Sequence, residues 1–249
     1  MSQMLVFLAG LFLPLFPLSM LFNALFARVR HPVLRAILLL AWPQIGLALI
    51  STANPAMPDW IVPWALFTSA LYGLRALMLR EVGMWLGFLA TSAWAVLWIP
   101  VLGGTSAPLV QLYALGFSAP FVLLALLSAG LERRFGAAYT GLYGGLAQSL
   151  PRFSGVLVMV VLAAIATPLF PAFFAMLASI LVATPASAVA LVGIWLLWSW
   201  AGARLLQGLV VGPANPQDSP DLSLAATWLY AVVLVALVIG GVYLIGDLR

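Results

Sequence analysis

The chain has 249 residues, of which 65% are hydrophobic and 6% are charged, and its mean hydropathy is +1.18. A water-soluble domain of this length could not carry so many apolar residues on its surface, so the composition indicates a polytopic membrane protein. Cysteine is absent and His31 is the single histidine, which excludes disulfides and thiolate chemistry and argues against metal sites or cofactors held by several histidines. The net charge of +4 comes from arginines between apolar segments, where they orient membrane helices, so nucleic-acid binding is not expected.

Eight apolar segments approach the length of about 20 residues that a membrane helix needs. The first segment lacks the charged start and the small-residue cleavage site of a signal peptide, so we expect it to be retained. The connections are short, so we expect one integral membrane domain over residues 1–249, with four helices in 1–107 and four in 108–249. We therefore predict an all-α polytopic membrane protein with helices over residues 4–27, 33–51, 60–79, 82–102, 108–131, 155–180, 187–211 and 224–245.

Arginine placement predicts the orientation of these helices. The connections after the first, third and fifth helices carry arginines, and those after the second, fourth and sixth carry none. Positively charged loops stay in the cytoplasm, so we expect both termini to lie outside, in the periplasm of a bacterial inner membrane. The loop arginines are Arg28, Arg30, Arg80, Arg133, Arg134 and Arg152.

Two further arginines, Arg75 and Arg204, fall within about two turns of the cytoplasmic helix ends. Long basic side chains at such positions extend to the interface, so we favour a structural or interfacial charge over a buried functional one.

Tryptophans fall into two groups along the chain. Four lie near predicted helix ends and are interpreted as interfacial anchors, and three lie inside the seventh helix and are expected to pack against a neighbour. The first group is Trp60, Trp64, Trp98 and Trp228, and the second is Trp195, Trp198 and Trp200.

The sixth helix contains two prolines, Pro168 and Pro171, that should break it. Proline removes a backbone donor and clashes with the preceding turn, so the carbonyls of residues 164–167 lose their helical partners. Lipid cannot satisfy these carbonyls, and the break must face either protein or a watery cavity. Such breaks mark the conducting site in many ion-coupled transporters, but a packed kink explains the prolines equally well. The sequence leaves both alternatives open, with Thr167 as a polar side chain at the break.

A glycine-bearing segment precedes this helix and continues into Pro151 and Arg152. Gly144 and Gly145 lack the following Lys-Ser/Thr that phosphate binding needs, so we predict a tight cytoplasmic turn.

The order of these features resembles the antiporter-like membrane subunits. The matching pattern is Gly144-Gly145-Leu146 with Pro151, the break at Pro168, Arg204 near the end of the next helix, and Asp221-Leu222-Ser223 before the last one. This family includes the proton-pumping subunits of respiratory complex I, the large Mrp antiporter subunits and the membrane subunit of bacterial inorganic-carbon (DAB) uptake complexes. The similarity covers about residues 112–247, and a weaker similarity at Pro14-Leu15-Phe16-Pro17 suggests that the first helix is also proline-broken. It implies a truncated member that matches the last eight of the family's fourteen helices.

The chain departs from the family where protons would move. The resemblance places an ionisable residue of the broken sixth helix at Met176, a lysine of the first break at Phe12, and a histidine at Ser19. Thioether, phenyl and hydroxyl groups cannot replace a relay of ionisable residues through the membrane. We therefore expect no proton path within this chain.

These features bear on three kinds of function. We favour a non-pumping accessory subunit, in the lipid bilayer, of an ion-coupled complex that contains a full-length antiporter-like subunit. The resemblance favours inorganic-carbon uptake, with Mrp-like or complex I-like assemblies as alternatives. A second hypothesis is an autonomous carrier or channel for a neutral solute, which would use the break at Thr167 and have Gln148 and Tyr143 at its mouth. An enzyme is not expected, because no acid and base pair can be assembled.

A partner subunit would be contacted through small residues, since membrane helices associate by close packing. The candidates are Ala163, Ala164 and Ala166 on the sixth helix and Gly240 and Gly241 on the eighth, although the glycines could equally pack internally.

Overall fold

The computed structural model describes residues 2–53, 57–142, 144–213 and 219–246, so Tyr143, named above, lies outside the described residues. Helices and their connections account for nearly all of the described residues, with one isolated bridge between Glu81 and Tyr139. The helices are α1 (Ser2–Phe12), α2 (Ser19–Arg28), α3 (Pro32–Ala53), α4 (Ile61–Met78), α5 (Val82–Val96), α6 (Trp98–Leu102), α7 (Ala107–Phe135), α8 (Leu146–Ser149), α9 (Pro151–Ala164), α10 (Pro171–Val182), α11 (Pro185–Leu209) and α12 (Leu224–Gly246).

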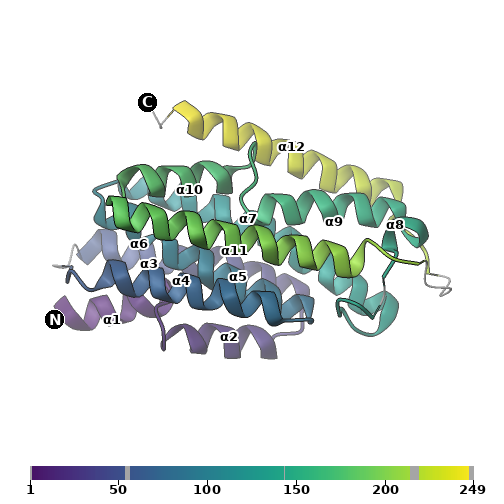
Figure 1. Ribbon diagram of the computed structural model, residues 1–249, viewed down its shortest axis with the longest axis horizontal. Coiled ribbons are helices and arrows are strands. Elements are labelled where there is room, and N and C mark those ends of the chain that lie inside the picture. The colour runs from purple at the N-terminus through teal and green to yellow at the C-terminus, as the bar shows by residue number, and fades with distance from the viewer. Residues whose placement is uncertain (1, 54–56, 143, 214–218, 247–249) are drawn as a thin grey trace.

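These helices make the eight predicted crossings. Six are long and apolar enough to span a membrane on their own, namely α3, α4, α5 with α6, α7, α11 and α12. The other two are pairs of shorter helices, α1 with α2 and α9 with α10, which follow one another along the bundle in Figure 1. The predicted proline breaks in the first and sixth helices are therefore confirmed.

Two boundaries differ from the prediction by four residues, each for a local reason. Helix α7 continues to Phe135 because the first residue that leaves the helix is Gly136, whose φ of 77° is adopted most readily by glycine. Helix α9 begins at Pro151, four residues early, because proline at the first helical position needs no backbone donor.

The crossings alternate in direction, so the connections gather at two ends (Figure 1). One end, called here the arginine-rich end, holds the connections between α2 and α3, α4 and α5, α7 and α9, and α11 and α12. The described chain starts and finishes at the opposite end. Helices α5 and α7 form the centre, with most of their residues buried, whereas α12 lies on the outside with only 11% of its span buried.

Two tryptophan predictions were wrong. Trp98 was expected at the interface but is fully buried, and Trp200 was expected to pack but is 60% exposed on the outer face of α11. Position near a helix end does not reveal which side of the helix faces the bundle, and that side decides burial. Trp60, Trp64 and Trp228 are partly exposed, in agreement with the prediction.

A buried arginine holds the arginine-rich end together. Arg35 is 6% exposed, and its Nη1 lies 3.4 Å from Oε1 of Glu132 at the end of α7. Its Nε donates to the carbonyl of Val29 at 2.6 Å, and its guanidinium lies 5.4 Å from the ring centre of Phe26. One side chain on α3 therefore joins the connection from α2 to the end of α7, and these contacts offset part of the cost of burying its charge.

Glu81, just before α5, joins this cluster with an altered acidity. Burial raises the pKa of its carboxyl above the usual 4.5, the nearby Arg35 opposes this shift, and Glu132 adds to it. The two carboxylates thus compete for one arginine.

This competition predicts opposite effects for two matched substitutions. Glu132→Gln removes the charge that pairs with Arg35 and should lower the free energy of unfolding by about 1–2 kcal/mol. Glu81 binds its proton more tightly in the folded chain, so its ionisation disfavours the fold as pH rises through the raised pKa. Glu81→Gln should therefore raise the Tm at neutral pH, and the gain should vanish below about pH 4.5, where wild-type Glu81 is protonated in both states. Thermal unfolding in detergent across pH 4–8 measures both effects, and a loss of Tm on Glu81→Gln at pH 7 would contradict this account.

Candidate functional site: the two helix breaks

The break in the sixth crossing is the six-residue segment 165–170 between α9 and α10. Ala166 and Leu169 have positive φ angles of 59° and 87°, which are uncommon for residues other than glycine and mark a locally strained backbone. The hydroxyl of Thr167 donates to the carbonyl of Leu162 at 2.9 Å, which closes the last turn of α9. Pro171 occupies the first position of α10.

The predicted site residues do not converge on a common space. Pro168 is exposed and Thr167 is half-buried, whereas Pro171 and Met176 are buried on α10. Pro171 packs against α7 at Gly116, where a β-carbon would come within 2.9 Å of it.

An indole closes the break instead. Trp195 of α11 donates from Nε1 to the carbonyl of Ala166 at 3.1 Å and lies 3.3 Å from that of Ile165. These are carbonyls that the prolines deprive of helical partners, as predicted. A protein donor therefore satisfies these carbonyls. Of the two alternatives left open by the sequence, a packed kink or a watery cavity, the packed kink holds for them.

Helix α12 covers the break from outside (Figure 1). A β-carbon at Gly241 would lie 2.5 Å from the carbonyl oxygen of Leu169, so only glycine allows this approach. Gly241 therefore packs internally, and the small residues Ala163, Ala164 and Ala166 are buried as well. The expectation that Ala163, Ala164 and Ala166 meet a partner subunit was wrong, because the chain's own helices occupy the space beside them. For Gly241 the alternative of internal packing, which the sequence left open, holds.

The first break, between α1 and α2, is closed in the same way. Three indoles from three different helices donate to carbonyls near it, and the amide of Phe16 donates to the hydroxyl of Thr68 at 3.0 Å. The pairs are Trp42 with Leu11 at 3.1 Å, Trp98 with Leu13 at 3.0 Å, and Trp64 with Phe16. Burial of Trp98, which the sequence analysis missed, follows from this bond.

The residues at the family's ionisable positions take part in packing. The ring of Phe12 lies 4.9 Å from that of Trp42, and Met176 is fully buried. The hydroxyl of Ser19 donates to that of Tyr72 at 2.9 Å.

The polar groups halfway along the described helices are uncharged. Ser92 accepts from the indole of Trp198 at 2.8 Å and also bonds with Ser69. Farther along, Trp94 donates to Ser118 at 3.0 Å, and Asn23 donates to Thr91 at 2.9 Å. In the part of the chain that the structure describes, the acids, arginines and His31 lie in connections or within about two turns of helix ends.

The predicted turn before α9 lies at the arginine-rich end. Gly145 has a φ of 75°, and a β-carbon there would come within 2.3 Å of the Pro213 carbonyl oxygen. Its amide donates to the carbonyl of Val211 at 3.2 Å. The glycine thus lets this turn press against the segment after α11.

Asp221 caps α9 across this end of the bundle. Its carboxylate accepts from the amides of Arg152 at 2.9 Å and Phe153 at 3.0 Å, the first amides after Pro151. A carboxylate is the favoured partner of a helix N-terminus. In the sequence Asp221 stands out only through the resemblance, because a cap 70 residues away leaves no local signal.

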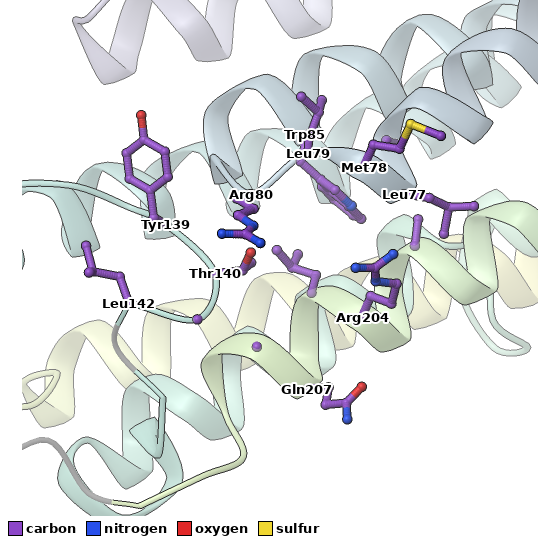
Figure 2. A pocket seen from close by; sticks show the side chains of 15 residues that line it. Leu77, Met78, Leu79, Arg80, Trp85, Tyr139, Thr140, Leu142, Arg204 and Gln207 are labelled. Carbon is purple, nitrogen blue, oxygen red and sulfur yellow. The ribbon is translucent and has the colours of Figure 1, made fainter.

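Both arginines flagged near helix ends are exposed. The guanidinium of Arg75 lies 4.9 Å from the ring centre of Phe88, and Arg204 borders a cleft together with Arg80 (Figure 2).

Many solved structures share this fold, and three of them are described here. No protein-family model and no curated protein matches the chain. A chain of respiratory complex I from Thermus thermophilus with bound NADH superimposes with a TM-score of 0.80 over 94% of this chain, at 21% identity. The membrane-bound sulfane sulfur reductase, an archaeal respiratory membrane complex, gives 0.74 over 93% at 16% identity, and the Mrp complex of Dietzia sp. gives 0.68 over 86% at 18% identity.

The chain has the fold of the antiporter-like membrane subunits. It spans about half the length of the chains it matches, namely 53%, 50% and 42% of them. The resemblance drawn from the glycine turn, the proline break and Asp221 is confirmed at the level of fold.

The indole closure predicts the effect of removing one donor. Trp195→Phe keeps an aromatic ring but leaves the carbonyls of Ile165 and Ala166 unpaired, which should cost about 1–2 kcal/mol. Thermal unfolding of the purified chain should show this as a Tm loss of several degrees.

The control is Trp200→Phe on the same helix, because Trp200 is 60% exposed and carries no hydrogen bond in the described structure. It should stay within about 0.5 kcal/mol of wild type. Equal losses for both variants would show that ring size, and not the indole donor, matters at Trp195.

Proposed function

We propose that this chain is a non-pumping subunit of an ion-coupled membrane complex and that it packs beside an antiporter-like subunit. The observation that carries the proposal is the closure of both helix breaks by tryptophan indoles. Phe12 and Met176 occupy the positions at which the antiporter-like family has ionisable residues. The chain thus keeps the broken helices but lacks the residues that would relay protons.

The solved structures support the proposal that the chain belongs to a membrane complex, but they do not identify that complex. Each is a complex named as respiratory or as Mrp, and at 21% identity or less the likeness extends to fold alone. We place proton-driven uptake of CO2 or bicarbonate first, since the resemblance includes such complexes and the others employ complete antiporter-like subunits. The subunit itself is proposed to have no enzymatic activity.

The proposed location is a bacterial inner membrane, with the arginine-rich end in the cytoplasm and both termini in the periplasm. The arginine distribution supports this orientation. Because the chain has no cysteine, single cysteines introduced at Ser106 and Ala147, which are exposed at opposite ends, would report the side of each end by labelling.

The alternative, an autonomous carrier for a neutral solute, would need the break near Thr167 to open. Trp195 and Gly241 occupy the space on two sides of that break, which favours the accessory subunit.

Purification of the tagged chain from its native membrane in mild detergent tests the proposal. A full-length antiporter-like subunit should accompany the chain at a fixed ratio, and the remaining partners, identified by mass spectrometry, would name the transported species. Recovery of the chain alone as a stable monomer or homo-oligomer would overturn the accessory-subunit proposal.

A proton assay tests the absence of a path. The chain reconstituted alone in vesicles should carry no protons above empty vesicles, and neither should Met176→Glu, because one buried acid without ionisable neighbours makes no relay. The fluorescence of a pH-sensitive dye inside the vesicles measures uptake. Uptake by the single variant would show that the rest of a path survives.

A further inference from the structure

A cleft of about 790 Å³ opens at the arginine-rich end and has no part in the proposed function. Its walls come from the end of α4, Trp85 of α5, the segment 139–142 and the last two turns of α11 (Figure 2). It therefore lies at the level where helices meet the connections, which is the depth of lipid headgroups in a membrane protein.

Two positive charges enter this cleft without a partner. Figure 2 shows the guanidinium groups of Arg80 and Arg204 directed into the same space from opposite walls. Among the described residues neither arginine takes part in an ion pair, since the pair present joins Arg35 and Glu132. The other described acids of this end are occupied, Glu81 beside Arg35 and Asp221 on the α9 amides.

A third donor lines the same cleft. Trp85 is 2% exposed, and its indole nitrogen has no hydrogen-bond partner in the described structure. A buried N–H without an acceptor is costly, so such groups in native proteins usually mark a missing partner. The hydroxyl of Thr140 also lies beside Arg80, whereas the side chain of Gln207 points away (Figure 2). The cleft thus offers donors and positive charge in one place, which is the chemistry that binds phosphate oxygens.

We propose that this cleft binds the phosphate of an anionic phospholipid, with Arg80 and Arg204 holding the phosphate and Trp85 supplying a donor at the wall. The site needs no partner subunit, so it is independent of the proposed function. The phosphate chemistry would also suit free inorganic phosphate, but the surroundings favour a lipid. Met78 is 75% exposed and Leu142 is 58% exposed at the cleft, so apolar surface for the glycerol and acyl chains adjoins the two charges.

Native mass spectrometry of the full chain, released from detergent and titrated with lipid, tests the proposal. Phosphatidylglycerol should give one adduct that saturates first, while zwitterionic phosphatidylcholine at the same concentration should bind more weakly. Arg80→Gln and Arg204→Gln should each weaken phosphatidylglycerol about fivefold, and the double variant more. Inorganic phosphate should neither form the adduct nor displace the lipid.

Arg30→Gln is the matched control, because Arg30 is exposed at the same end, outside the cleft, and the substitution changes the charge equally. It should leave the adduct unchanged. Thermal unfolding of all variants shows whether they fold, and little change is expected because Arg80 and Arg204 make no side-chain hydrogen bond in the described structure.

Four outcomes would overturn the proposal. An equal loss with Arg30→Gln would show general attraction to a basic surface, and unchanged binding in the folded double variant would exclude the cleft. Displacement by phosphate would make it a site for a free anion. No adduct with wild type would leave the arginines to another anion, such as an acidic segment of a partner protein.

Discussion

The fold depends on hydrogen bonds from tryptophan indoles to the carbonyls that its broken helices expose. A helix that stops inside a membrane has carbonyls that lipid cannot satisfy, and leaving such groups unpaired destabilises the fold. Trp42, Trp64, Trp98 and Trp195 resolve this problem from four different helices. An indole suits the task because it brings one donor on a large apolar ring, so it pairs the carbonyl and fills the surrounding space at once.

This solution explains how the fold persists without charges in its middle. A lysine or glutamate at a break can bind the free backbone groups, but it needs water or a counter-ion to remain charged. An indole needs neither. The Ser69, Ser92 and Trp198 network and the Ser19 and Tyr72 pair are likewise uncharged, and their groups are satisfied by pairing with one another.

The features that depend on composition and on the positions of prolines could be predicted from the sequence. Eight apolar stretches, two breaks and the resemblance to antiporter-like subunits followed from residue order, and the comparison of folds agrees with them. Burial was harder to predict, because an apolar membrane helix has no polar face to reveal which side meets lipid. Trp98 and Trp200 were misplaced for this reason, and Ala163 was taken for outer surface.

Pairings between distant segments were also beyond the sequence. Nothing near Arg35 indicates that its partner is Glu132, and nothing near Pro151 indicates that Asp221 caps the helix it begins. The cleft between Arg80 and Arg204 depends on two turns that meet only after folding. The position of Arg204 near a helix end could be predicted, but its place beside Arg80 in one cleft could not.

Helix α12 is attached to the broken sixth crossing at two points. Asp221 ties the chain just before α12 to the start of α9, and Gly241 seats the helix on the strained connection between α9 and α10. The outermost helix therefore acts as a brace across both halves of the broken crossing. Rotation of the two halves against each other would strain both attachments, so a protein that bound the exposed face of α12 would stiffen the break without touching it.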